Sequence, residues 1–551
     1  MSPDPAVEPA GEPDHDVVII GGGHNGLVAA TYLARAGLRV VVLEGRDEFG
    51  GAVASRRLFS GVDARVSRFS YLVSLLPDRI VADLGLQLEL RSRPVKSYSP
   101  VGEAGLLVER PEGVATQASF ARLTGDDRAY AAWQQLEHEL ETVAAVIAPT
   151  LTEPLPRSDA LQAQIDPALW RGLVERPIGE LVEERFDDNT VRGVVLTDAL
   201  IGTFASAHDA GLAQNRCFLY HVIGNGTGEW RVPVGGMGSV AAALERAART
   251  AGAHLRTNST VTGVESLATG GAEVTLADGS RLRARHLLAN CAPAVLDALL
   301  SRRDAVGPEG SQTKVNLLLR RLPRLRSGID PEVGFAGTLH LGQGYARLEE
   351  AFREAESGHM PDPLPCEVYC HTLTDDSILA PDLRAAGYHT LTVFGLHTPA
   401  RLFRDDPAGA RAAAGQAALN ALQHVLSEPM EDCLARDGHG NLCVEVMSPL
   451  DVEAALNMPG GHIFHGDLQW PWLSDDAVVR TPAERWGVST DLPGVLLCGS
   501  GSVRGGAVSG LGGHSAAQAV LEVEFLGRAA QPDFARKPGF ASVSPRAPLA
   551  Q

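Results

Sequence analysis

Three glycines and one glutamate carry the clearest chemical signal in this chain. Gly21, Gly23 and Gly26 form a G-x-G-x-x-G pattern directly after the apolar run at residues 17–20. In such a pattern the first glycine allows a tight turn, the second lets a pyrophosphate approach the backbone, and the third lets a helix pack closely on the strand. Glu44 follows the next apolar run, residues 40–43, where an acid can accept a ribose hydroxyl. The spacing therefore predicts a dinucleotide site.

The elements that position these residues follow from hydrophobic periodicity. Residues 14–51 are typical of a strand, a turn, a helix that stops at Gly37 and a second strand. His24 and Asn25 lie in the turn, where the free N–H groups of the helix can bind phosphate. An Asp-Gly pair predicts a hairpin over residues 272–284. Further helices are expected at 122–146, 187–205, 239–251, 409–426 and 509–526, and further strands at 254–257, 260–265, 286–290, 315–319, 366–371, 389–394 and 494–500.

Length and charge limit the classes of protein and partner. The 551 residues allow two or more domains, and a hydrophobic fraction of 44% is ordinary for a globular protein. The net charge of -19 argues against a nucleic-acid partner, because phosphate binding needs clustered lysine and arginine. The same charge disfavours docking on anionic lipid by charge alone.

The cysteines indicate reduced thiols. The chain has seven cysteines at scattered positions and contains no C-x-x-C, so neither a disulfide framework nor dithiol redox chemistry is expected. Cys366, Cys370 and His371 form the one cluster that suggests a metal, but no second cluster at zinc spacing supports it. We therefore interpret the cluster as packing and predict no metal site.

The ends of the chain are expected to be tails. Residues 1–13 are rich in proline and acid and lack the basic and apolar regions of a signal peptide, and residues 529–551 are rich in proline. The longest apolar runs are shorter than a membrane-spanning helix. These features predict a cytoplasmic protein with a disordered N-terminal tail.

Several motifs later in the chain carry a resemblance to a known family. They are Gly50-Gly51, the V-P-x-G-G-M-G segment at 232–238, the A-N-C-A-P segment at 289–293, and the glycines of residues 499–513. Over residues 14–527 the chain resembles the FAD-containing amine oxidase and phytoene desaturase superfamily. Residues 24–27, 201–205, 461–466 and 497–499 are similar to the phytoene dehydrogenase-like group within it.

The resemblance implies a two-domain α/β fold. An FAD-binding Rossmann-type domain, similar to that of glutathione reductase, would be assembled from residues 14–80, 230–300 and 484–528. An inserted α+β domain, residues 81–229 and 301–483, would bind the substrate. FAD is the implied cofactor, and an NAD dehydrogenase is disfavoured because its fingerprint is usually followed by further βαβ units.

The resemblance also assigns cofactor contacts. Gly21, Gly23 and Gly26 would hold the pyrophosphate and Glu44 the adenosine ribose. The remaining assigned positions are Gly50 and Gly51 near the phosphates and ribityl chain, Val261 at the adenine, Gly499 and Ser500 at the pyrophosphate or ribityl, and Gly505 and Gly506 beside the flavin ring. Tight packing is the alternative explanation for the late glycines.

Three residues are candidates for catalysis. Lys314 resembles the lysine that amine oxidases often keep at a strand start, where it holds a water near the flavin. The alternative interpretation of Lys314 is a structural lysine in a salt bridge. His462 and His465 lie in a glycine-rich loop, and each either faces the substrate as an acid, base or hydrogen-bonding group or caps a turn.

The expected activity is oxidation of an apolar or amphipathic organic small molecule, carotenoid-like or isoprenoid-like, by a desaturase or oxidase. Hydride transfer to FAD would be followed by electron transfer to oxygen or a quinone. An amine oxidase is the first alternative, although Gly505 stands where classical amine oxidases place an aromatic residue over the substrate. The second is an FAD-containing binding or assembly protein with little turnover. An apolar lip could add peripheral membrane contact, and no oligomeric state is predicted.

Overall fold

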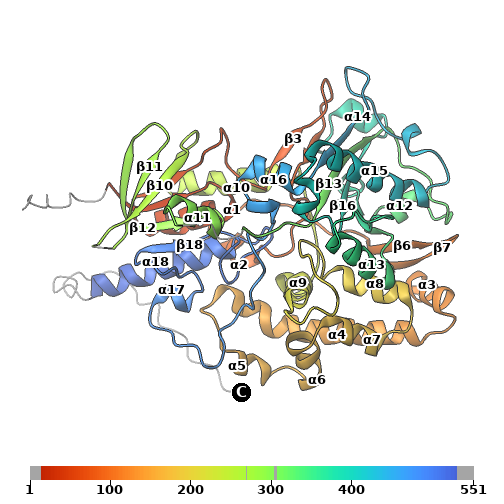
Figure 1. Cartoon of the computed structure of the whole chain (residues 1–551), viewed down its shortest axis with the longest axis horizontal. Helices are drawn as coiled ribbons and strands as arrows, with labels where there is room; N and C mark the ends of the chain where they lie inside the picture. The colour runs from red at the N-terminus through yellow and green to blue at the C-terminus, as the bar shows by residue number, and fades with distance from the viewer. Residues whose placement is uncertain (1–13, 269, 303–306, 530–551) are drawn as a thin grey trace, which may run out of the picture.

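The computed structural model describes residues 14–268, 270–302 and 307–529 (Figure 1). The predicted tails, residues 1–13 and 529–551, lie outside the described residues except for Ala529. The domain boundaries stay a prediction, but the sheets can be compared with them directly.

The first sheet collects strands that are far apart in the sequence. Its parallel part runs in the order β9-β2-β1-β12-β18, and an antiparallel hairpin extends it through β12. Its strands come from all three segments expected to build the dinucleotide domain. Their bounds are β1 His15–Ile20, β2 Val40–Leu43, β9 His254–Arg256, β10 Val261–Ser266, β11 Ala272–Leu276, β12 Arg281–Ala289 and β18 Val495–Leu497.

Alternating side chains of β1 bury both faces of this sheet. Val17 and Ile19 pack in a core with the helices α1 (His24–Arg35), α10 (Met237–Thr250) and α18 (Leu511–Ala529), and α1 contacts both other helices. Val18 and Ile20 pack on the opposite face, where α11 (Pro293–Leu299) and the hairpin β10–β11 lie. A parallel sheet buried on both faces explains the continuous apolar run before Gly21.

The second sheet is mostly antiparallel. Its order is β17-β13-β16-β15-β14-β6-β7, with one parallel pair between β14 and β6. The strands are β6 Val95–Val101, β7 Ala104–Glu109, β13 Thr313–Leu319, β14 Thr338–Leu341, β15 Cys366–Tyr369, β16 His389–Gly395 and β17 Val444–Met447.

Successive side chains of β13 point to opposite faces of the second sheet, so every other residue faces the space between the two sheets. Val315 and Leu317 pack in the same core as Leu422 of α15 (Pro407–Val425). Lys314 and Asn316 therefore point to the opposite face, where they bond to the backbone of residues 67–69. This face looks toward the segment that follows the first nucleotide-binding unit.

Helices on the side of the second sheet away from α15 complete the fold. Figure 1 shows α4 and α7 crossing beneath this sheet, with α8 and α9 between them and the strands. These and the other helices are α2 Asp78–Leu84, α3 Val114–Thr124, α4 Arg128–Ile147, α5 Ser158–Gln162, α6 Pro167–Trp170, α7 Ile178–Arg185, α8 Asn189–Thr197, α9 Ala213–Val222, α12 Pro331–Gly334, α13 Tyr345–Glu356, α14 Pro381–Ala385, α16 Pro449–Leu456 and α17 Pro482–Arg485. The short strands are β3 Ser55–Arg57, β4 Arg65–Ser67, β5 Leu90–Arg91 and β8 Val232–Pro233.

Two expected helices differ from the observed ones. The helix expected at 122–146 is two helices, because α3 ends at Gly125, whose φ of 85° is left-handed. The helix expected at 187–205 ends at Thr197, and Gly202 with φ 84° belongs to the loop beyond it. In the first case a glycine marks the break, whereas in the second the helix is capped by Asp198, before Gly202 is reached.

Among the described helices, none combines the length and apolar character needed to cross a lipid bilayer.

Replacing the third fingerprint glycine should destabilise the fold. In Gly26→Ala the new Cβ would lie 2.4 Å from the carbonyl oxygen of Gly21, so the helix and strand must separate. We expect the free energy of unfolding to fall by about 1–3 kcal/mol, measured by denaturant unfolding. Gly263→Ala is the control, since its nearest neighbour would be the Thr275 Cβ at 3.9 Å. Equal stability of the two variants would contradict the prediction.

Candidate active site

A cavity of about 550 Å³ lies between the two sheets, at the edge where the parallel strands β1 and β2 end. Ligands in open α/β folds bind at this edge of a parallel sheet. The structure brings most of the predicted site residues into its wall: Gly21, Gly23, His24, Asn25, Glu44, Gly51, Val261, Lys314, His465, Ser500 and Gly506.

Four predicted glycines do not reach the cavity wall. A Cβ on Gly26 or Gly505 would collide with a carbonyl oxygen, of Gly21 at 2.4 Å and of Ser500 at 1.8 Å respectively. A Cβ on Gly50 would lie 2.8 Å from the Cβ of Ala241 on α10, and one on Gly499 would lie 3.2 Å from the Asn290 carbonyl oxygen. Close backbone packing is thus a sufficient reason for glycine at these four positions, and the cofactor contact expected of them stays a prediction.

His462 also lies away from the cavity. Its side chain is buried, and its Nδ1 accepts hydrogen bonds from the backbone N–H groups of Phe464 at 3.2 Å and Gly466 at 3.4 Å. Its Nε2 lies 3.8 Å from a carboxylate oxygen of Asp467. These contacts are those of the alternative, a histidine that caps the turn, and a catalytic role for His462 stays a prediction.

Asn290 holds the nucleotide-binding turn together. It follows β12, its Nδ2 donates to the carbonyl of Gly21 at 2.9 Å, and its backbone N–H donates to Ile20. The same Nδ2 lies 3.2 Å from where a Cβ of Gly23 would stand. Backbone from β1, β12 and the loop after β18 thus meets at one amide, and the glycines are what allow the approach.

Glu44 lies in the wall at the end of β2. Its carboxylate accepts from the backbone N–H of Gly22 at 2.8 Å and of Arg46 at 3.0 Å, and its side chain is buried. Each carboxylate oxygen keeps a second lone pair, which is what a ribose hydroxyl requires. Val261, Ser259 and Thr260 line the same end of the cavity.

The loop after β18 forms another part of the wall through Ser500 and Gly506. The fully buried Arg504 fixes this loop by donating to the carbonyls of Leu151, Glu153 and Pro154. A buried guanidinium that satisfies three carbonyls holds the loop against the helical layer.

Lys314 reaches the cavity from β13. Its Nζ donates to the carbonyls of Ser67 and Phe69, both at 2.8 Å, and lies 5.2 Å from the ring centre of Phe394. Burial lowers the pKa of its amine to about 7, partly offset by the charge of Glu445. Lys314 therefore does not form the salt bridge of the alternative explanation with any described residue, because its Nζ bonds to two neutral carbonyls. The third donor position of Nζ is left for a ligand or water.

Two histidines in the wall have unsatisfied ring nitrogens. His24 Nε2 and His465 Nδ1 are buried without a hydrogen-bond partner in the described structure. Burial lowers the pKa of each ring to about 4, so both are neutral at physiological pH. Buried polar atoms of this kind require a partner, which a bound ligand can supply.

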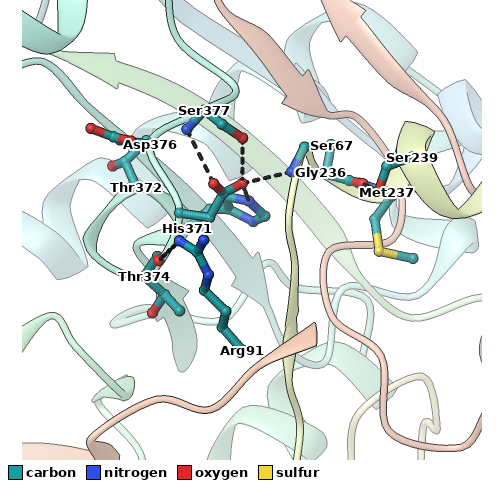
Figure 2. A network of polar contacts seen from close by, with 12 residues as sticks. Ser67, Arg91, Gly236, Met237, Ser239, His371, Thr372, Thr374, Asp376 and Ser377 are labelled. Carbon is teal, nitrogen blue, oxygen red and sulfur yellow. Dashed lines mark hydrogen bonds and ion pairs between the residues drawn. The ribbon is translucent and has the colours of Figure 1, made fainter. Parts of the chain in front are cut away.

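A network outside the cavity connects the two sheets (Figure 2). The Asp375 carboxylate accepts from the Gly235 N–H at 2.8 Å and pairs with His371 Nε2 at 3.3 Å. Two residues along, Met237 N–H donates to Ser67 Oγ at 3.0 Å, and Ser67 O is an acceptor of Lys314. The glycine-rich start of α10 is therefore tied to the second sheet and to the lysine.

The cysteines take no part in this chemistry. All seven are free thiols, and burial raises the pKa of Cys291, which lines the cavity, to about 12. The described residues contain no group of histidine, cysteine and carboxylate side chains placed to hold a metal ion.

Sequence reasoning missed several wall residues. Asn290 belonged to a recognised motif, but its position in the site depends on three segments meeting: the turn after β1, the end of β12 and the loop after β18. The apolar part of the wall gives no local signal that it faces a cavity, because its members come from separate loops and elements: Phe69, Tyr71, Leu72, Leu75, Ile201, Tyr220, Trp230, Phe394, Ile463, Phe464 and Leu468.

The residues present fit FAD. The turn leaves a backbone cradle without side chains at Gly21, Gly23 and Gly51, and Glu44 supplies a carboxylate at the end of β2. Beyond this cradle the cavity continues to Lys314 and the unpaired nitrogens of His24 and His465. The pyrophosphate would lie at the start of α1, and the redox ring would lie toward Lys314.

Removing the charge of Glu44 should weaken cofactor binding. Glu44→Gln keeps the size of the side chain but loses a charge-assisted hydrogen bond, so the Kd for FAD should rise about tenfold. The measurement is titration of apoprotein with FAD, followed by quenching of flavin fluorescence. Glu265→Gln is the matched control, since Glu265 is exposed on β10. An unchanged Kd in Glu44→Gln would remove the ribose assignment.

Comparisons with known proteins agree with this geometry. The sequence model of the family described as flavin containing amine oxidoreductase matches residues 26–323, more than half of the chain. An uncharacterized protein of Mycobacterium tuberculosis is 47% identical over 524 residues, covering 92% of this chain and 97% of that protein. The mouse pyridine nucleotide-disulfide oxidoreductase domain-containing protein 2 is 29% identical, covering 93% and 94%.

Solved structures share the fold. Wild-type putrescine oxidase bound to putrescine superposes with a TM-score of 0.55 at 17% identity, covering 93% of this chain and 99% of that one. The expected α/β fold is thereby confirmed, and the family match supports FAD as the cofactor. The chain belongs to the flavin-containing amine oxidoreductase family and is an FAD-dependent oxidoreductase.

Proposed function

We propose that this oxidoreductase is an oxidase or desaturase of an apolar or amphipathic organic molecule, with electrons passing from FAD to oxygen or a quinone. The observation that carries the proposal is the chemistry of the cavity wall. Among the described residues, Glu44 is the one carboxylate in that wall, and it lies at the nucleotide end. Aromatic and aliphatic side chains form much of the remainder, beside Lys314 and neutral polar groups.

A wall of this kind favours a neutral ligand. Moving an ammonium ion from water into an apolar cavity is costly unless a carboxylate pairs with it. Phe69, Leu72 and Ile463 instead offer apolar surface, which stabilises a hydrocarbon by removing it from water. An isoprenoid-like substrate meets these requirements.

The chain's own residues would orient the substrate and exclude water. FAD, when bound, supplies the acceptor for a hydride. Tyr71 and Phe394, whose ring centres are 4.5 Å apart, form a wall beside Lys314. The Nζ of Lys314 holds a proton that can be donated to oxygen as oxygen is reduced.

An amine oxidase is the second candidate function. The rings of Tyr71, Tyr220 and Trp230 line the cavity, and aromatic faces attract cations as well as apolar groups. An amine that binds in its neutral form would also avoid the cost of burying a charge. Cytoplasmic location and peripheral membrane contact remain predictions of the sequence.

The choice between these functions can be made with the flavin itself. Purified holoenzyme is titrated anaerobically with the isoprenoid squalene in detergent, with cyclohexylamine and with putrescine, while the absorption band of oxidised flavin is recorded. We expect squalene to bleach the band and putrescine to leave it unchanged, because Glu44, the one carboxylate among the described wall residues, lies at the nucleotide end and cannot pair with a dication at the substrate end. Bleaching by the amines alone would favour an amine oxidase. A band that no compound bleaches would favour a binding protein with little turnover.

Reoxidation by oxygen should depend on Lys314 and on pH. Because the lysine pKa is about 7, Nζ is protonated below that pH and neutral above it. If the proton assists oxygen, the reoxidation rate constant falls as pH rises through about 7. Lys314→Met should lower the rate at acidic pH roughly 100-fold and abolish the pH dependence.

Stopped-flow mixing of reduced enzyme with oxygenated buffer measures this rate. Lys96→Met is the control, because Lys96 pairs with Glu137 away from the cavity. A pH profile that is the same in Lys314→Met and in the unmodified enzyme would reduce Lys314 to a structural residue.

A further inference from the structure

His221 is a residue of the cavity wall whose two ring nitrogens differ in their partners. The residue lies on α9 and its side chain is buried. It belongs to none of the groups invoked above for cofactor binding or proton transfer. Among the described residues no group bonds to its Nε2, although its other ring nitrogen is fully engaged.

The protonation state of this ring follows from its neighbours. His221 Nδ1 lies 2.9 Å from the carbonyl oxygen of Cys217, one helical turn earlier. A carbonyl only accepts, so Nδ1 carries the proton. Burial lowers the pKa of the imidazole, which keeps the ring neutral and leaves Nε2 as a bare acceptor.

The charged and titratable groups around the ring do not change this state. Asp198, just beyond α8, is the carboxyl that faces His221, and burial raises the pKa of Asp198 itself. On α9 the thiol of Cys217 donates to the carbonyl of Ile201 at 3.2 Å, and burial raises its pKa to about 12.

Trp230 fixes the orientation of the ring. The two rings stack with centres 5.1 Å apart and planes at 27°. Trp230 is held in turn because the next residue, Arg231, exchanges two backbone hydrogen bonds with Val73. The neighbours of Val73 on that segment, Leu72 and Tyr71, line the same cavity. The acceptor is therefore held rigidly within the apolar wall.

We propose that His221 Nε2 orients the substrate by accepting a hydrogen bond, and that the substrate is accordingly an apolar molecule carrying a hydroxyl or an uncharged amino group. The inference rests on the proposed use of this cavity for an apolar or amphipathic substrate, and it selects the amphipathic class. A pure hydrocarbon such as squalene can still bind through the apolar wall, but it leaves this acceptor without a partner and therefore binds less tightly than a matched alcohol.

Binding of two matched probes to the holoenzyme tests the proposal. Isothermal titration compares 3-phenylpropan-1-ol with propylbenzene, which differ in the hydroxyl group. The unmodified protein should bind the alcohol about tenfold more tightly. His221→Phe keeps a ring stacked on Trp230 but removes the acceptor, so the preference should disappear. His221→Gln keeps an acceptor at similar reach and should retain most of the preference.

Two outcomes would overturn the proposal. One is the absence of any preference for the alcohol in the unmodified protein, and the other is an undiminished preference in His221→Phe. If either variant fails to fold, the unmodified holoenzyme can be treated with diethyl pyrocarbonate and its peptides mapped by mass spectrometry. A free, neutral Nε2 in the cavity should be modified, and slowly when 3-phenylpropan-1-ol is bound. An unmodified His221 would contradict the assignment.

Failure of this proposal and failure of the proposed function give different results. Probe binding requires no turnover, so the alcohol preference can stand even if no compound bleaches the flavin. Conversely, bleaching by squalene together with equal binding of the two probes would keep the oxidase and remove the role of His221.

Discussion

The close approach of backbone segments around Asn290 is the constraint on which the site depends. Its side-chain amide bonds to the carbonyl of Gly21, Gly23 of the same turn lies against it, and Gly499 approaches it from the loop after β18. A Cβ on Gly23 or Gly499 would lie 3.2 Å from an atom of Asn290, closer than an ordinary contact. Because these segments are separated by hundreds of residues, the contacts that hold the turn in place depend on assembly of the parallel sheet.

Hydrogen bonds between distant segments also connect the nucleotide site to the second sheet. Lys314 belongs to β13, but its acceptors, the carbonyls of Ser67 and Phe69, belong to the segment that follows the first βαβ unit. Ser67 is bonded in turn to the start of α10, which Asp375 holds from the second sheet (Figure 2). Hydrogen bonds to backbone carbonyls hold the amine in position although burial disfavours its charge. The position of the lysine thus depends on contacts from both sheets.

Local sequence patterns predicted the parts of this structure that follow local rules. The spacing from β1 through the turn and helix to Glu44 follows a known pattern, so these elements were predicted. The strand β13 was predicted from its hydrophobic residues. Gly505 and His462 were expected at the cofactor or substrate because they stand beside the right motifs. Whether such a residue faces the cavity depends on how its loop packs. Here Gly505 packs against the backbone of Ser500, and the His462 ring lies beside Asp467. The placement of Asn290 and His221 in the site became apparent only when distant segments were brought together.

Burial gives the cavity a consistent chemical character. It shifts four titratable groups of the wall toward their uncharged forms: the pKa of His24 and of His465 falls to about 4, that of Lys314 falls to about 7, and that of Cys291 rises to about 12. Each shift has the same cause, the cost of a charge in a region of low dielectric constant. Away from Glu44 and Arg46 at the nucleotide end, the wall near neutral pH therefore presents neutral donors and acceptors beside aromatic faces, with one amine poised between its two states. Such a wall discriminates by shape and by single hydrogen bonds, which suits an apolar substrate with one polar group better than a fully charged one.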